Sequence, residues 1–189
     1  KIAPENISFS NTKEFRTQAT PLAWSKMAIK NELGADLYSE LQLKAMFTGE
    51  IGGSLGETSV IALLIGGIYL LIRRTVSFHI PLAVITSAFV FATIAYLRDS
   101  YTYVPPLFHL TSGGLILCAF FIATDPVTAP LTRRGMWIFG IGVGTITMLI
   151  RITGAYPEGV MFSVLLMNAV TPLIDRLCRR IPTGGKPGA

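Results

Sequence analysis

Five long apolar runs constrain the fold of this chain more than any other feature. They lie at about residues 51–72, 80–97, 107–124, 135–150 and 156–174. A hydrocarbon core of roughly 30 Å needs about 17 to 25 helical residues to cross it, which is close to the length of each run. Because a backbone in lipid must satisfy its own hydrogen bonds, the runs predict helices. We expect an all-α integral membrane protein with five transmembrane helices.

Charge divides the chain into three parts. Residues 1–50 carry 6 Lys/Arg and 6 Asp/Glu, whereas the other 139 residues carry only 10 and 5. We predict a polar segment at 1–50, a five-helix membrane domain at 51–178 and a basic tail at 179–189. Basic residues that flank membrane spans account for the net charge of +5, so we do not expect a nucleic-acid partner. The 2 cysteines cannot supply the four thiolates of an iron–sulfur cluster, and no metal site is predicted.

Loop charges predict the orientation, because Lys and Arg concentrate on the cytoplasmic side of a membrane protein. One side holds eight basic residues, namely Arg73, Arg74, Arg133, Arg134, Arg176, Arg179, Arg180 and Lys186, and the other holds Arg98 and Arg151. The C-terminus should therefore be cytoplasmic and residues 1–50 extracytoplasmic. An exported polar segment normally follows an earlier crossing, so we expect this chain to be part of a longer polypeptide.

A short pattern in the polar segment predicts either a helix cap or a modification site. The residues run Thr17-Gln18-Ala19-Thr20-Pro21-Leu22-Ala23. In the simpler interpretation Thr20 is an N-cap and Pro21 the first residue of a surface helix. The same geometry directs free backbone N–H groups at Thr20, so a phosphoester on its hydroxyl would also fit.

Two acids lie within or beside the apolar runs. Four glycines in the eight residues 49–56 precede Glu57 at the start of the first run. Glu57 is either a costly embedded carboxylate with a function or, if the glycine-rich stretch is a re-entrant loop, a cap for a helix beginning at Thr58. Asp125 ends the third run before Pro126 and lies between Thr124 and Thr128. Asp125 is either part of a turn or, with these hydroxyls, an oxygen site for a cation or a proton.

The remaining polar and glycine residues of the runs favour structural roles. Gly140 and Gly144 have the spacing of close helix packing, and Gly113-Gly114 is interpreted in the same way. Asn168 is expected to form an interhelical hydrogen bond. Arg151 and the stretch 156–159 predict a tight outer turn, and His79 and His109 are not expected to bind metal.

Three stretches resemble one family of membrane proteins. These are Gly52–Ser59, Phe120–Val127 and Tyr156–Asp175. They resemble the D subunit of the Rnf complex, a membrane-bound ferredoxin:NAD+ oxidoreductase, and the related B subunit of the sodium-translocating NADH:quinone reductase. The resemblance covers residues 15–178 almost continuously. It implies ten spans in two five-helix halves, of which this chain resembles the second half with the preceding outer loop.

The resemblance also implies a cofactor. Family members carry FMN on a Thr in a pattern similar to Asp-x-x-Ser/Thr-Gly-Ala-Thr, which a flavin transferase modifies. Thr17, Ala19 and Thr20 match this pattern and Pro21 continues it, so the resemblance identifies Thr20 as the residue that carries covalent FMN. Gln18 stands where the pattern has Gly, and Glu14 where it has Asp. Riboflavin is implied as a second, non-covalent flavin, although no residue here is matched to it.

The function implied by the resemblance is an electron relay in the bacterial inner membrane, coupled to Na+ or H+ transport. From their placement among the apolar runs we hypothesise that Glu57 and Asp125 belong to the ion pathway. The implied partners are the other Rnf subunits, membrane lipid and, indirectly, ferredoxin and NAD. Two other interpretations remain open: half of a channel or carrier with broken helices and no redox cofactor, or a scaffold that only packs against other subunits.

Overall fold

The computed structural model describes residues 22, 47–49, 59–99, 103–154, 156 and 158–178. Within these residues the chain is all-helical, as expected. Three helices have the length and apolar composition to cross a membrane, namely α4 (His79–Arg98), α7 (Arg133–Thr153) and α8 (Val160–Leu177). These correspond to the second, fourth and fifth apolar runs, although α8 begins four residues later than predicted. The protein is therefore an all-α membrane protein.

The first apolar run forms a shorter helix than predicted. Helix α3 spans Val60–Ile72, which at 1.5 Å per residue is about 20 Å long. Its cap is Ser59, whose Oγ accepts a hydrogen bond from the backbone N–H of Ala62 at 3.4 Å. The helix thus begins at Val60 rather than at Thr58.

The third apolar run is not one helix, and this prediction was wrong. It consists of α5 (Pro106–Thr111), α6 (Leu115–Leu117) and the π-helical turn η3 (Cys118–Ile122). The break lies at residues 112–114, where Gly113 has a φ of +67° that a right-handed helix cannot contain. Gly113-Gly114 therefore interrupts the span, whereas the sequence had suggested that it mediates helix packing.

Helices α4 and α7 form the closest pair in the bundle. A methyl group at Gly140 would come within 2.6 Å of Ala83 Cβ, and one at Gly144 within 2.6 Å of the carbonyl oxygen of Val84. Only glycine allows the two backbones to approach so closely. The packing role predicted for Gly140 and Gly144 is confirmed.

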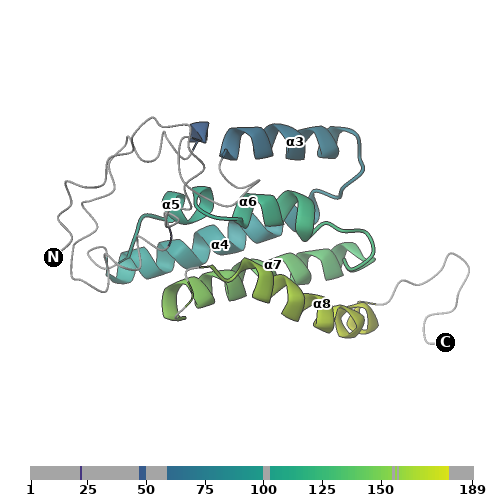
Figure 1. The fold of residues 1–189 in the computed structure, drawn as a ribbon. Helices are drawn as coiled ribbons and strands as arrows, with labels where there is room; N and C mark the ends of the chain where they lie inside the picture. Colours follow the sequence, from purple (N-terminus) through teal and green to yellow (C-terminus); the bar gives the residue numbers. More distant parts are fainter. Residues whose placement is uncertain are drawn as a thin grey trace, which may run out of the picture.

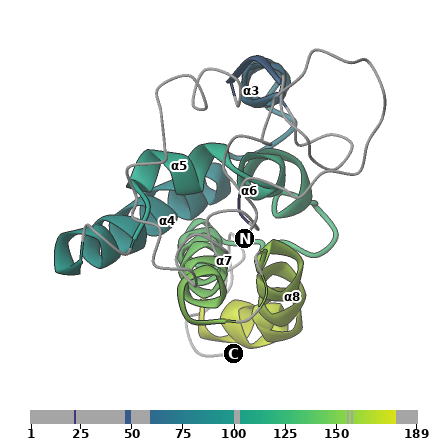
Figure 2. The ribbon, with the colours of Figure 1, turned by 60° about the vertical axis from the view of Figure 1, so that its left-hand side comes forward.

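The other contacts place the broken span inside the bundle. Figure 1 shows α5 and α6 between α3 on one side and α7 and α8 on the other, and Figure 2 shows the same order from another direction. Helix α3 packs through Gly67, where an added methyl group would meet the ring of Phe120 in η3. Helices α7 and α8 share a buried hydrogen bond of 2.6 Å between Thr147 Oγ1 and Ser163 Oγ.

Candidate site at the break in the third span

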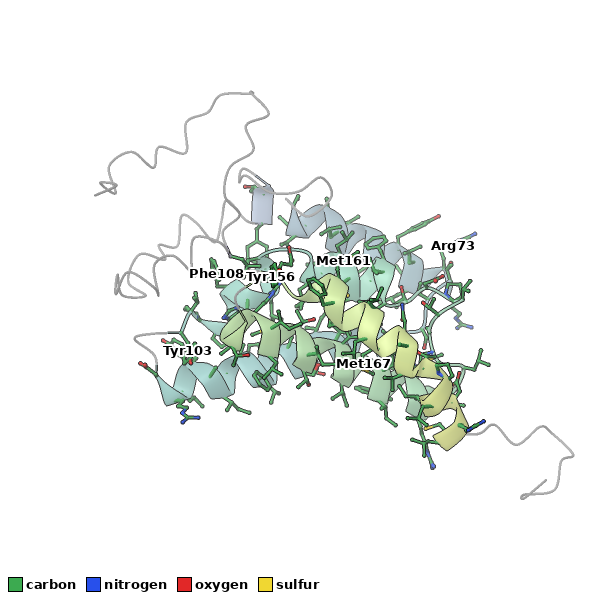
Figure 3. The ribbon with its side chains drawn as sticks, turned by 60° about the horizontal axis from the view of Figure 1, so that its bottom comes forward. Arg73, Tyr103, Phe108, Tyr156, Met161 and Met167 are labelled. Carbon is green, nitrogen blue, oxygen red and sulfur yellow. The ribbon has the colours of Figure 1, made fainter. Side chains whose placement is uncertain are left out.

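The two ends of the bundle differ in chemistry. Tyr103, Phe108 and Tyr156 lie at one end and Arg73 at the other, so we call them the Tyr156 end and the Arg73 end (Figure 3). The break between α5 and α6 belongs to the Tyr156 end, because it contacts the end of α7 and the start of α8. Discontinuous helices are common where membrane proteins bind substrates or ions.

A buried arginine donates hydrogen bonds to the backbone carbonyls on the α5 side of the break. Arg151, in the last turn of α7, is only 3% exposed. Its Nη1 donates to the backbone carbonyl of His109 at 2.6 Å, and its Nη2 donates to the carbonyl of Ser112 at 3.2 Å. These carbonyls lie at the end of α5, where the helix leaves its last carbonyls without helical donors. Arg151 therefore supplies hydrogen-bond donors that a continuing helix would have supplied to these carbonyls.

A carboxylate accepts a hydrogen bond from the backbone on the α6 side of the break. Glu158 Oε1 accepts a hydrogen bond of 2.6 Å from the backbone N–H of Gly114, immediately before α6. The same oxygen lies 3.4 Å from Arg151 Nη2 and forms an ion pair with it. The carboxylate neutralises the charge of the Arg151 guanidinium, whose side chain is fully buried, whereas the Glu158 side chain is 31% exposed.

Leu22 packs onto this break from the opposite end of the sequence. It is 2% exposed. A methyl group at Gly113 would come within 2.6 Å of Leu22 Cδ1, 2.5 Å of Glu158 Oε1 and 3.1 Å of Arg151 Nη2. The absence of a side chain at Gly113 therefore creates the space in which Leu22 and the ion pair meet.

Two buried polar atoms beside the break have unused hydrogen-bonding capacity. Among the described residues, His109 Nδ1 and Ser112 Oγ have no hydrogen-bond partner, although their side chains are 6% and 0% exposed. Buried polar atoms are usually paired, so unpaired ones indicate a place for a further polar group. His109 and Ser112 are also the two residues whose backbone carbonyls accept hydrogen bonds from Arg151.

A second region of interest lies towards the Arg73 end. A cavity of about 460 Å³ is lined by residues that follow α3, by η3 and the turn after it, and by α8. Asp125 borders this cavity and is half-buried. Its Oδ1 accepts from the backbone N–H of Val127 at 3.3 Å and its Oδ2 from Thr128 Oγ1 at 3.2 Å. These bonds form a turn, and they also leave acceptor capacity on both carboxylate oxygens.

Asn168, on α8, also lines this cavity. Its Oδ1 is buried and accepts no hydrogen bond in the described part of the chain, so the interhelical hydrogen bond predicted for Asn168 is not made by this oxygen. Pro172, four residues later in α8, has no N–H, so the Asn168 carbonyl also lacks its usual helical donor. The cavity therefore brings together oxygen atoms from two parts of the chain.

Several predicted site residues cannot be placed. Thr17, Ala19, Thr20, Pro21 and Glu57 lie outside the described residues. Of the predicted set, only Asp125 is described, and it lies in the cavity rather than at the break.

The sequence interpretation missed the ion pair. Arg151 and Glu158 had been assigned to a tight turn, but Arg151 belongs to α7 and Glu158 binds the break. The sequence did contain a signal for this ion pair. Two opposite charges bracket a hairpin between apolar runs, and two glycines lie inside another run.

Comparison with known proteins identifies relatives along nearly the whole chain. A sequence model of the NQR2, RnfD, RnfE family matches residues 2–184. The D subunit of an ion-translocating oxidoreductase complex from Stutzerimonas stutzeri is 50% identical over 145 residues, which are 75% of this chain and 41% of that protein. The D subunit of a proton-translocating ferredoxin:NAD(+) oxidoreductase complex from Clostridium ljungdahlii is 44% identical, covering 89% of this chain and 51% of that protein.

A third relative carries a different ion in its name. The D subunit of a Na(+)-translocating ferredoxin:NAD(+) oxidoreductase complex from Acetobacterium woodii is 42% identical over 86% of this chain and 48% of that protein. The chain thus spans about half the length of the curated relatives it matches.

Proposed function

The chain belongs to the NQR2, RnfD, RnfE family, and from this membership we propose that it is part of an electron-relay subunit in a membrane complex that couples ferredoxin:NAD+ oxidoreduction to ion transport. The family resemblance drawn from the sequence is confirmed by the match over residues 2–184. This match is the observation that carries the proposal, together with the names of the three relatives. The other subunits of the complex are its partners, and ferredoxin and NAD+ exchange electrons with the complex elsewhere.

The cofactor that we propose is FMN, bound covalently to Thr20. Thr17, Ala19, Thr20 and Pro21 supply the attachment pattern. Leu22, two residues after Thr20, is buried beside Arg151, and the neighbouring His109 and Ser112 retain polar atoms without partners. This donor set suits a polar flavin near the break. FMN, when bound, supplies one- and two-electron transfer, and the protein supplies its position and electrostatic surroundings.

Asp125 and Glu57 are proposed to serve ion movement. Asp125 and Asn168 line one cavity beside a π-helical turn and a proline-containing helix, where helical hydrogen bonds are interrupted. Carboxylate, amide and carbonyl oxygens are the ligands that Na+-like hard cations prefer, and carboxylates also carry protons. The relatives are named for Na+ in one case and for protons in another, so both ions fit the family.

The proposed location is the bacterial inner membrane, with lipid around α4, α7 and α8. Residues 1–50 are extracytoplasmic in this proposal and the tail after α8 is cytoplasmic, which places the Tyr156 end outside and the Arg73 end inside. The count of eight basic residues against two in alternate loops supports this orientation.

A covalent flavin distinguishes this proposal from a channel, a carrier or a scaffold. The complete subunit is expressed with its complex, and the denatured chain is examined for in-gel flavin fluorescence, since only a covalent flavin survives denaturation. We expect fluorescence from the wild type and from Thr12→Ala, a control in the same segment, but none from Thr20→Ala. Fluorescence that persists in Thr20→Ala would refute the attachment site, and a wild type without fluorescence would refute the cofactor.

A further inference from the structure

Leu22 is one of the described residues that tie the polar segment to the membrane domain. Phe47 is another, since its backbone carbonyl accepts a hydrogen bond from Ser59 Oγ at 3.3 Å. The Leu22 side chain is 2% exposed, although the surrounding segment of residues 1–50 is rich in charge. Burying a leucine side chain is favourable because it removes apolar surface from water. Such a contact fixes one point of the polar segment against the membrane domain.

The site that receives Leu22 depends on a glycine. Gly113 has a φ of +67°, and any side chain there would meet Leu22 Cδ1 at 2.6 Å. Glycine is needed both for this backbone conformation and for this space.

Charged groups form the other wall of the same site. Arg151 Nη2 and Glu158 Oε1 would lie 3.1 Å and 2.5 Å from a methyl group at Gly113. Both groups are fixed by bonds to the backbone of the break, Arg151 to the Ser112 carbonyl and Glu158 to the N–H of Gly114. The wall is therefore rigid, which is what a supporting shell requires in order to hold a functional group in position.

We propose that Gly113, Arg151 and Glu158 form a seat for Leu22, and that this seat positions the flavin on Thr20 at the break in the third span. The inference rests on the proposed attachment of FMN to Thr20. Two residues of extended chain span at most about 7 Å, so the Thr20 backbone cannot be further than that from the Leu22 backbone. Leu22 and Gly113 are thus positioning residues, which act on electron transfer through the location of the cofactor.

The first test compares flavin content with flavin reduction in the assembled complex. Leu22→Asp introduces a charge into the seat, and Gly113→Ala fills the space. We expect both variants to keep covalent FMN within twofold of the wild type by in-gel fluorescence. The rate at which reduced ferredoxin reduces that flavin, followed by its absorbance, should fall at least tenfold. Leu22→Met, which conserves volume, and Gly142→Ala, which meets only the flexible end of Met167, should stay within twofold.

The second test measures the seat without any electron transfer. In a Cys118→Ser, Cys178→Ser background, Leu22→Cys should react slowly with a water-soluble maleimide. Adding Gly113→Ala should speed this reaction at least tenfold. If the Gly113→Ala variant fails to assemble, the flavin reduction rate of Leu22→Asp alone tests whether the seat positions the flavin.

Three results would overturn the seat. The first is flavin reduction in Leu22→Asp at the wild-type rate. The second is a labelling rate of Leu22→Cys that Gly113→Ala does not change. The third is loss of the flavin itself from Leu22→Asp, which would mean that Leu22 is needed for flavin attachment and not for flavin positioning. An absence of covalent flavin from the wild type would instead contradict the proposed function, so the two failures are distinguishable.

Discussion

Arg151, in the last turn of α7, and Glu158, in the connection between α7 and α8, meet at the break between α5 and α6. Arg151 Nη2 is 3.4 Å from Glu158 Oε1. Each residue also binds the break in the third span, Arg151 at the end of α5 and Glu158 at the start of α6. The pair therefore connects three segments at the Tyr156 end, and it supplies partners for three backbone groups of the break, the carbonyls of His109 and Ser112 and the N–H of Gly114.

Removing the carboxylate should destabilise the membrane domain. Glu158→Ala leaves the buried Arg151 without its counter-ion and the N–H of Gly114 without its acceptor. We expect a loss of roughly 1–3 kcal/mol, the cost of leaving buried polar groups unpaired. Glu158→Gln keeps an acceptor and should lose less. Thermal unfolding of the solubilised complex measures the effect, with the exposed Arg176→Ala as control. Equal stability of Glu158→Ala and the control would contradict a structural role for the pair.

Alanine substitutions at two glycines of α7 should differ in their cost to stability, because one glycine faces a backbone and the other a flexible side chain. Gly144→Ala directs a methyl group at the Val84 carbonyl, 2.6 Å away, where neither backbone can yield. Overpacking of this kind costs roughly 1–3 kcal/mol. Gly142→Ala meets only the end of Met167, an adaptable side chain on α8 (Figure 3), and should cost less than about 1 kcal/mol. Thermal unfolding and the yield of assembled complex compare the two. A larger loss from Gly142→Ala would refute the close α4–α7 contact.

Neutralising the embedded acids should impair ion transport more than flavin content. Asp125→Asn keeps the turn geometry but removes the charge beside the cavity. Glu57→Gln removes the carboxylate charge in the first apolar run. The complete complex, reconstituted in vesicles, would be assayed for ferredoxin-driven NAD+ reduction together with ion uptake. We expect fewer ions per electron, or slower uptake, with covalent FMN unchanged. Wild-type ion uptake in both variants would show that these acids only cap helices.

The two termini of this chain should label from opposite sides of the membrane. Single cysteines at Ser39 and at Thr183 would be exposed to an impermeant thiol reagent on intact cells whose outer barrier is permeable to it. Because the basic loops predict a cytoplasmic C-terminus, the cysteine at position 39 should react at least tenfold faster. Cell lysis should make the rates similar, which controls for intrinsic reactivity. Faster labelling at position 183 on intact cells would reverse the topology.

Much of the architecture could be predicted because membrane thickness sets the length of a span. The run at 80–97 became α4 with a change of one residue at each end, and the run at 135–150 became the core of α7. The spacing of Gly140 and Gly144 also predicted close packing, which depends only on side-chain size along one helix face. These features follow from local composition, so one segment at a time was enough to find them.

The candidate site was less predictable because its partners are distant in the sequence. A continuous third helix was the reasonable expectation for residues 107–124, since no charge or proline interrupts them. Asn168 was expected to have a partner on another helix, yet its Oδ1 borders a cavity.

The sequence by itself determined that this protein is a helical membrane protein and which family it resembles, because hydrophobic length and short motifs are local properties. Only the tertiary structure decided that the third span breaks at Gly113. A break in lipid is stable only when its freed carbonyl and N–H groups find partners. Those partners, Arg151 and Glu158, lie about 40 residues further along the chain and reach the break only when α7 and α8 pack against it.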